Sequence, residues 1–136
     1  RGLGVDSADK PVYLLAWSSA GPAAYELLAS AELPIEGAAI AMSVFRAEFI
    51  QRASLRSKRA VVIHAEDDAV VAFDRARAAV GTLQLHGADA KLAPMRGGHG
   101  WKDGPYLHIR RAVEWLGSAE PNRSPSQLDA SLEPDE

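Results

Sequence analysis

The chain has 136 residues, a formal net charge of −3 and no cysteine. This length fits one domain better than two. Without cysteine there is no disulfide, thiol nucleophile or cysteine-ligated metal site, so covalent chemistry must use oxygen or nitrogen nucleophiles. No apolar run approaches the roughly 20 residues that cross a bilayer, so we expect no membrane span. The sequence begins at Arg1 without a recognisable leader, and it leaves the cellular location open.

The negative charge lies in the last 20 residues. Residues 117–136 carry five acidic residues and one arginine, whereas residues 1–116 carry 14 basic and 13 acidic residues. Serine, proline and acidic residues dominate residues 117–136, so we predict a disordered acidic tail there. Residues 1–116 are nearly neutral and have no basic stripe with interleaved aromatic residues. We therefore expect no nucleic-acid partner.

Short apolar runs alternate with amphipathic segments along residues 1–116. Apolar strands that alternate with helices are typical of a parallel sheet with helices on both faces, which predicts the α/β class. In chain order we predict a strand at Pro11–Trp17, a helix at Ala20–Ala31, a strand at Gly37–Val44, a helix at Arg46–Ser57, a strand at Arg59–His64, a helix at Phe73–Leu85, a strand at Ala90–Met95 and a helix at Pro105–Leu116.

The first predicted strand, Pro11–Trp17, is apolar throughout. It has no charged residue of the kind that protects an exposed sheet edge. We therefore expect a neighbour to pair with it. That neighbour is either a segment upstream of Arg1 or a second chain, and the second case would give self-association through this strand.

The serine pair Ser18-Ser19 lies where this strand turns into the first helix. A serine nucleophile on a sharp strand-to-helix turn needs small residues two positions before and after it, and Ala16 and Ala20 meet that need in place of the usual glycines. The Ser19 amide, at the start of the helix, would face developing negative charge and form half of an oxyanion hole. Ordinary capping of the helix is the alternative interpretation.

Two further polar segments follow later strands. Glu66, Asp67 and Asp68 follow the third predicted strand, and His99, flanked by glycines, follows the fourth. The carboxyl ends of parallel strands share one edge of a sheet, so a carboxylate there could orient the histidine as a general base for Ser18. An acidic loop that caps the next helix is the simpler alternative, and the residues alone do not decide which acid would serve.

The order of these groups along the chain is serine, then acid, then histidine. This is the order of the catalytic groups in α/β-hydrolases, whereas two other folds with the same triad use different orders. The remaining histidines, His64, His86 and His108, are predicted to be non-catalytic. Three placements that agree are a stronger indication than any one of them.

Four segments, YLLAWSSAGPAAY, IHAEDDAVV, GGHGW and IRRAVEWL, resemble the C-terminal half of the phospholipase/carboxylesterase branch of the α/β-hydrolases, which includes dienelactone-hydrolase-like and predicted esterases. The resemblance covers about residues 5–116. It implies an α/β-hydrolase fold whose N-terminal strands, with the second oxyanion amide, lie outside this sequence. The histidine-glycine-x-x-aspartate pattern of that branch selects Asp68, with Ala65 at the glycine position, and the two other patterns select Ser18 and His99.

These features predict a serine hydrolase that cleaves carboxylic esters through an acyl-enzyme. Ser18 would be the nucleophile, His99 the proton shuttle and Asp68 the group that orients the imidazole. The expected substrate is a small-molecule ester, with no cofactor and no metal. The expected walls of the open site are Trp17 and Trp101, for which core packing is the alternative.

Two other functions remain open from the sequence. One is a serine peptidase of the same fold. The other is a truncated or non-catalytic fragment that needs upstream residues or a partner chain, because losing one oxyanion donor costs about 10²–10³ in kcat.

Overall fold

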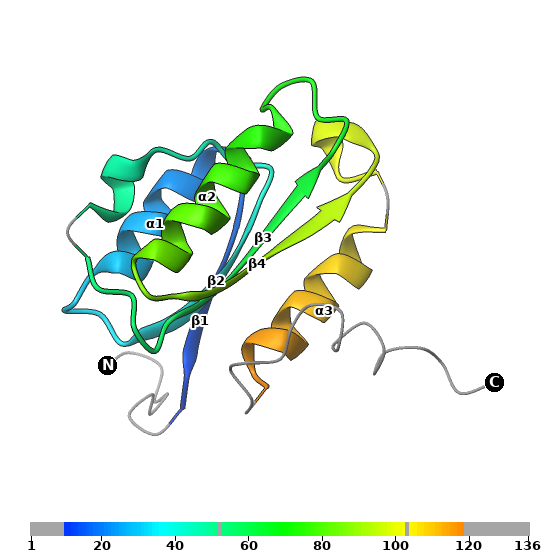
Figure 1. Cartoon of the computed structure of the whole chain (residues 1–136). Helices are drawn as coiled ribbons and strands as arrows, with labels where there is room; N and C mark the ends of the chain where they lie inside the picture. Colours follow the sequence, from blue (N-terminus) through cyan, green and yellow to red (C-terminus); the bar gives the residue numbers. More distant parts are fainter. Residues whose placement is uncertain (1–9, 52, 103, 119–136) are drawn as a thin grey trace.

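The chain forms a parallel sheet with helices on both faces, in a computed structural model that describes residues 10–51, 53–102 and 104–118 (Figure 1). The four strands stand in the order β1-β2-β3-β4, and each neighbouring pair is parallel. This confirms the predicted α/β class. In chain order the elements are β1 (Val12–Trp17), η1 (Ser18–Ala20), α1 (Gly21–Ala29), β2 (Ile35–Ala41), η2 (Ala47–Ile50), β3 (Arg59–Ala65), α2 (Phe73–Leu85), β4 (Asp89–Met95), η3 (Gly98–Gly100) and α3 (Pro105–Leu116).

The sheet separates two apolar layers. Helices α1 and α2 cover one face and α3 covers the other (Figure 1). Alternate residues of β3 serve the two layers, because successive strand side chains point to opposite faces: Val62 packs with α1 and α2, whereas Val61 and Ile63 pack with α3. Both faces are therefore buried at the centre of the sheet, as the uninterrupted apolar runs in the sequence predicted.

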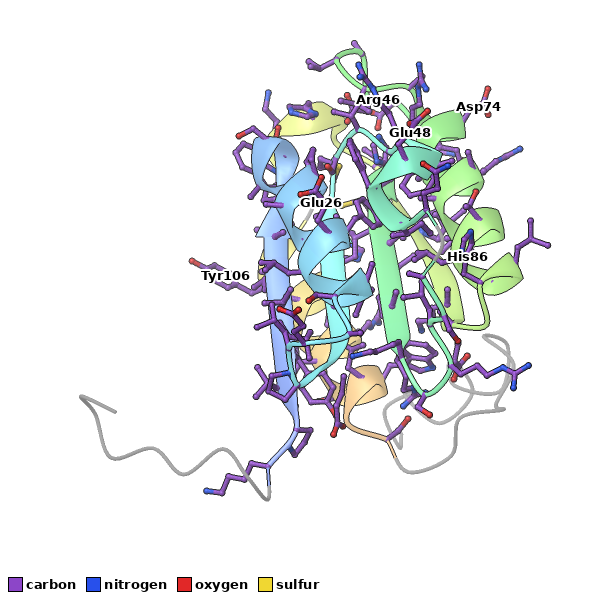
Figure 2. The ribbon with its side chains drawn as sticks, turned by 90° about the vertical axis from the view of Figure 1, so that its left-hand side faces the viewer. Glu26, Arg46, Glu48, Asp74, His86 and Tyr106 are labelled. Carbon is purple, nitrogen blue, oxygen red and sulfur yellow. The ribbon has the colours of Figure 1, made fainter. Side chains whose placement is uncertain are left out.

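The predicted helix at Arg46–Ser57 is wrong. In the described part of this segment only Ala47–Ile50 is helical, as a 3₁₀ turn. Beyond this turn the backbone bonds to the residue after α2, His86, which Figure 2 labels. The Leu55 amide donates to the His86 carbonyl, and His86 Nδ1 lies 2.8 Å from the Ala53 carbonyl oxygen. These contacts satisfy the backbone groups that a helix would have used.

The other predicted strands and helices are present, with boundaries shifted by a few residues. The strand predicted at Gly37–Val44 ends earlier, at Ala41, because Met42 has a φ of 52° that an extended strand cannot accommodate. Strand β1 lies at one edge of the sheet, and the neighbour expected for it stays a prediction. Of the tail predicted at residues 117–136, all but Gly117 and Ser118 lies outside the described residues.

Arg59, the first residue of β3, fixes α3 to the sheet. One guanidinium nitrogen donates to the carbonyls of Trp115 and Ser118 at 2.6 and 2.7 Å, and the guanidinium carbon lies 4.0 Å from the centroid of the Trp115 ring. Its Nε lies 3.3 Å from Asp89 Oδ2 on β4. A cation at this position suits the carbonyl groups that a helix leaves unpaired at its C-terminus.

Among the described residues, no helix is long and apolar enough to cross a membrane.

Candidate active site

The turn from β1 into α1 sets the position of Ser18. Trp17 is still extended, with φ −130° and ψ 136°, whereas Ser18 has a φ of 52°. A non-glycine residue in this region is strained by on the order of 1–3 kcal/mol, and such strain is typical of a nucleophile turn. After the serine, the backbone lies closest to another segment at Gly21, where an added Cβ would lie 1.6 Å from Ser43 Oγ. Ala20, in contrast, is exposed. The sequence predicted close packing at both Ala16 and Ala20, and Ala16 is buried.

Ser18, His99 and Asp68 form one hydrogen-bonded chain. Ser18 Oγ lies 2.9 Å from His99 Nε2, and His99 Nδ1 lies 2.8 Å from Asp68 Oδ2. A carboxylate beside Nδ1 keeps the proton on that nitrogen, which leaves Nε2 free to accept the serine proton. The three residues follow β1, β3 and β4, and they meet because the carboxyl ends of parallel strands share one edge of the sheet.

Asp68 is held on both of its oxygens. Oδ1 accepts hydrogen bonds from the amides of Val70 and Val71, each at 2.8 Å, and Oδ2 faces His99. Burial alone would raise the pKa of the Asp68 carboxyl, but the hydrogen bonds from the Val71 amide and from His99 outweigh it and lower the pKa. The buried carboxylate is therefore ionised at neutral pH and suited to stabilise an imidazolium.

A second histidine lies beside the same acid. His64 is fully buried on β3; its Nε2 lies 2.8 Å from the Val71 carbonyl oxygen and 3.2 Å from Asp68 Oδ2. Because a carbonyl only accepts, Nε2 of His64 must carry the proton. Sequence reasoning treated His64 as structural and missed this contact. The four-residue spacing from Asp68 across a strand end was the available signal.

The three acids that the sequence left open have separate positions. Only Asp68 contacts the His99 ring. Asp67 is exposed, and its carboxylate accepts hydrogen bonds from the amides of Gly97 and Gly98 at 3.1 Å. Glu66 is exposed, and its amide donates to the Met95 carbonyl.

The two candidate wall tryptophans differ in their surroundings. The Trp17 ring lies 5.7 Å from the His99 ring, centroid to centroid, and Trp17 is 46% exposed. Trp17 therefore flanks the serine–histidine pair. Trp101 packs against the apolar layer beneath α3, which corresponds to the core-packing alternative. Ser19 follows Ser18 in the 3₁₀ turn and is exposed, and the oxyanion role of its amide stays a prediction.

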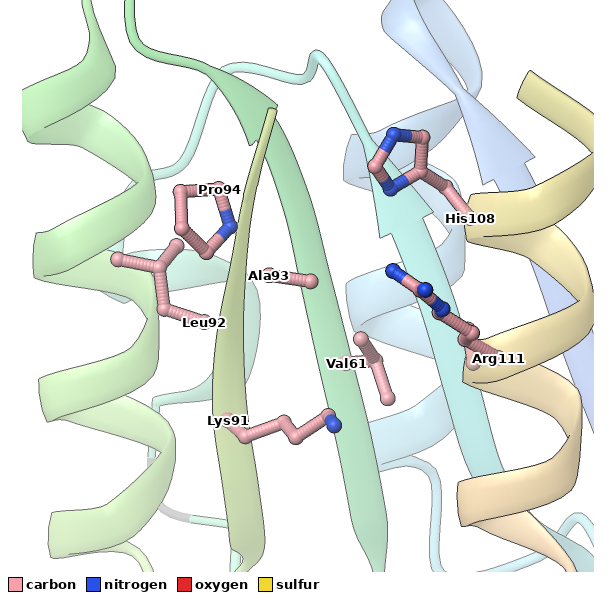
Figure 3. Close-up of a pocket in the computed structure, with 8 residues that line it drawn as sticks. Val61, Lys91, Leu92, Ala93, Pro94, His108 and Arg111 are labelled. Carbon is pink, nitrogen blue, oxygen red and sulfur yellow. The ribbon is translucent and has the colours of Figure 1, made fainter. Parts of the chain in front are cut away.

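One described groove lies on the α3 side of the sheet. This groove, of about 190 Å³, separates β4 from α3, and its lining includes Lys91, His108 and Arg111 (Figure 3). Neither Ser18 nor His99 lines it. Among the described residues, no group of three or more histidine, aspartate or glutamate side chains is placed to hold a metal ion.

Solved structures with a similar fold include hydrolases. The Bacillus cereus carboxylesterase matches with a TM-score of 0.64 and 18% identity, over 77% of this chain and 48% of that one. SOBER1 of Arabidopsis thaliana matches with a TM-score of 0.63 and 19% identity, over 83% and 55%. The uncomplexed acylaminoacyl peptidase of Pyrococcus horikoshii matches with a TM-score of 0.64 and 12% identity, over 88% and 26%.

These similarities show that the chain has the α/β-hydrolase fold, which confirms the fold expected from the sequence. The chain spans about half the length of the carboxylesterase and of SOBER1. No protein-family model matches it, and no curated protein matches it in sequence.

Proposed function

We propose that this chain carries the catalytic side chains of a serine hydrolase that cleaves carboxylic esters. The observation that carries the proposal is the hydrogen-bonded chain from Ser18 through His99 to Asp68. Its order along the sequence, its position at the carboxyl edge of the sheet and the strained φ of Ser18 all support the same assignment.

The mechanism follows from the positions of the protons. His99 Nε2 takes the Ser18 proton as Oγ attacks the ester carbonyl, and Asp68 stabilises the imidazolium that forms. The tetrahedral intermediate collapses when the imidazolium gives its proton to the leaving alcohol, which leaves an acyl-enzyme. Water, deprotonated by His99, then attacks the acyl-enzyme and releases the carboxylic acid and free Ser18.

The oxyanion of that intermediate needs hydrogen-bond donors. The Ser19 amide is one donor in this proposal, because it directly follows the nucleophile in the turn. The second donor of this fold comes from a segment that the resemblance assigns to the N-terminal half. Since one lost donor costs about 10²–10³ in kcat, we expect the chain alone to turn over slowly and a protein that includes that half to turn over fully.

A small ester substrate is favoured by the exposure around Ser18. Trp17 offers one aromatic flank beside the histidine, and it is half exposed. A serine peptidase is the second candidate, and the acylaminoacyl peptidase among the similar structures favours it. The rates on p-nitrophenyl acyl esters and on peptide anilides of the same acyl group decide between the two.

A fluorophosphonate probe tests the nucleophile. The wild-type chain is expected to be labelled, and Ser18→Ala is not. Ser19→Ala is the matched control, because the neighbouring serine is proposed to act through its amide and should still be labelled. Equal labelling of wild type and Ser18→Ala refutes the assignment. An unlabelled wild type favours the non-catalytic fragment.

A further inference from the structure

Two adjacent carboxylates hold the loop that carries His99. Asp68 binds the imidazole ring, and Asp67 binds the backbone on the N-terminal side of the ring. We propose that Asp67 is a positioning residue, whose carboxylate holds the Gly97 and Gly98 amides so that His99 reaches Ser18 and Asp68 together. This inference rests on the proposed role of His99.

The geometry around Asp67 is that of an anion held by consecutive amides. The Gly97 amide lies 3.1 Å from Oδ1 and 3.3 Å from Oδ2, and the Gly98 amide lies 3.1 Å from Oδ1. Both glycines have positive φ, 110° and 69°. Successive amides in such conformations converge on one point and favour a negative charge there. The carboxylate of Asp67 supplies that charge from within the chain.

Gly98 has open space on the side where a side chain would lie. A Cβ added at Gly98 would meet nothing within 4 Å, so the glycine is not wedged between neighbours. Met95 before the loop is buried, and Trp101 after it packs against the layer under α3. Between Met95 and Trp101, the backbone amides that donate to an acidic side chain in the described structure are those of Gly97 and Gly98. Both donate to Asp67. The His99 ring has its own contacts with Asp68, Ser18 and Trp17, and the bonds from Asp67 hold the backbone that carries this ring.

Charge strengthens this contact. The pKa of the Asp67 carboxyl is lowered, most strongly by the hydrogen bond from the Gly98 amide. Burial is the next-largest effect and opposes this, but the amides of Gly97 and of Asp67 itself and the positive charge of Arg96 add to the lowering. The carboxylate is thus ionised at neutral pH, and hydrogen bonds to an ionised acceptor are stronger than those to a neutral one. An asparagine at 67 would keep one oxygen acceptor and lose the charge.

The expected effect falls on kcat. A catalytic group must be held within about 0.5 Å of its productive position, and a displacement of about 1 Å costs on the order of 10²-fold in rate. Asp67 does not touch the reacting atoms, so its loss should leave KM unchanged. We expect Asp67→Ala to lower kcat on p-nitrophenyl butyrate by about 10- to 100-fold, and Asp67→Asn to recover part of that loss.

Glu66→Ala is the matched control. It removes the neighbouring exposed carboxylate, whose side chain is in no described hydrogen bond with the His99 loop, and leaves its backbone bond to Met95 intact. It should keep the wild-type kcat. If Asp67→Ala and Glu66→Ala have equal kcat, the proposal is overturned. It is also overturned if the loss in Asp67→Ala only follows a smaller folded fraction by circular dichroism and Asp67→Asn recovers nothing.

A second measurement does not depend on activity. In proton NMR the Nδ1 proton of His99, bonded to Asp68, should give a downfield signal in wild type and in Glu66→Ala. The signal should broaden or disappear in Asp67→Ala. If wild type shows this signal but cleaves no ester, the proposed function fails, and the His99 signal of Asp67→Ala still tests the positioning role. An unchanged His99 signal in Asp67→Ala overturns the positioning role.

Discussion

His64 Nε2 lies 2.8 Å from the carbonyl oxygen of Val71, whose amide donates to the Asp68 carboxylate. The histidine, the loop carbonyl and the acid thus close a small ring of hydrogen bonds at the end of β3. His64 is fully buried, and its Nδ1 has no hydrogen-bond partner among the described residues. The ring therefore depends on one N–H group, and its loss would leave the Val71 carbonyl without this donor and remove one of the contacts of Asp68.

Replacing His64 by phenylalanine should weaken both stability and turnover. The substitution keeps an aromatic ring of similar size and removes the N–H donor. Losing this hydrogen bond to the Val71 carbonyl should cost about 0.5–1.5 kcal/mol, so the urea midpoint should fall. The kcat on a p-nitrophenyl ester should fall as well, beyond the loss of folded protein, because Asp68 loses its contact with His64 and Val71, whose amide holds Asp68, loses its own donor.

His86→Phe is the control for that comparison. His86 Nδ1 lies the same 2.8 Å from a backbone carbonyl oxygen, that of Ala53, but on a loop away from Ser18. It should lower stability and leave the kcat of the folded fraction unchanged. If both variants reduce kcat only in proportion to unfolding, His64 has no role at the acid.

Asp68→Asn should reduce turnover far more than it disturbs the fold. An amide at this position no longer holds the imidazole in the tautomer that accepts the serine proton, and the corresponding change in a serine protease costs about 10⁴-fold in kcat. Single-turnover measurements with a p-nitrophenyl ester check this loss. Wild-type turnover in Asp68→Asn would remove Asp68 from the mechanism.

The difference in stability between wild type and Asp68→Asn should depend on pH. The folded pKa of Asp68 is lowered, so the ionised carboxylate favours the folded state, and this contribution is complete above the ordinary pKa of about 3.9. It is lost as the pH falls through the lower folded value. The difference in unfolding free energy between wild type and Asp68→Asn should therefore be larger at pH 7 than at pH 3 in urea titrations. A difference that grows on acidification contradicts the lowered pKa.

The meeting of Ser18, Asp68 and His99 could be predicted because it depends on topology. Each residue follows a strand, and parallel strands bring their carboxyl ends together whatever the details of packing. The helix predicted at Arg46–Ser57 failed for the opposite reason. Its amphipathic pattern is real, but the His86 loop offers its backbone better partners, and that loop lies 30 residues further along the chain.

The finer parts of the site depend on atoms that no sequence pattern encodes. The bonds from the Gly97 and Gly98 amides to Asp67 require two left-handed glycines to face one carboxylate across 30 residues. The close approach in the serine turn shifts by one residue, to Gly21, because Ser43 of another loop lies against that position. Both follow from how loops are oriented after the strands have paired.

Arg59→Ala should destabilise the chain by about 3 kcal/mol, because it leaves carbonyls at the end of α3 and the Asp89 carboxylate without their cation. Arg110→Ala is the control. Arg110 pairs with Glu114 at 3.1 Å, but its side chain is 78% exposed, so its loss should cost at most about 0.5 kcal/mol. Equal urea midpoints for the two variants would mean that Arg59 does not fix α3.

Gly21→Ala should destabilise the turn by about 1–3 kcal/mol, since overpacking forces neighbours out of position. The cause is steric: φ at Gly21 is −60°, which alanine adopts freely, whereas the added Cβ would lie 1.6 Å from Ser43 Oγ and 2.3 Å from Ser43 Cβ. Gly81→Ala is the control, because a Cβ there meets nothing within 4 Å on helix α2. It should stabilise the chain by roughly 0.5–1 kcal/mol.

Adding Ser43→Gly to Gly21→Ala tests the steric cause directly. The second substitution removes the two Ser43 atoms that clash with the new Cβ and leaves Ile40 Cγ2 at 3.3 Å, so the double variant should unfold at a higher urea concentration than the sum of the single effects predicts. Ser18 lies three residues before Gly21. Fluorophosphonate labelling of Ser18 should therefore be weaker in Gly21→Ala than in wild type, and stronger again in the double variant. Additive effects of the two substitutions would mean that the turn yields at some other point, and that the contact between Gly21 and Ser43 does not set the position of the nucleophile.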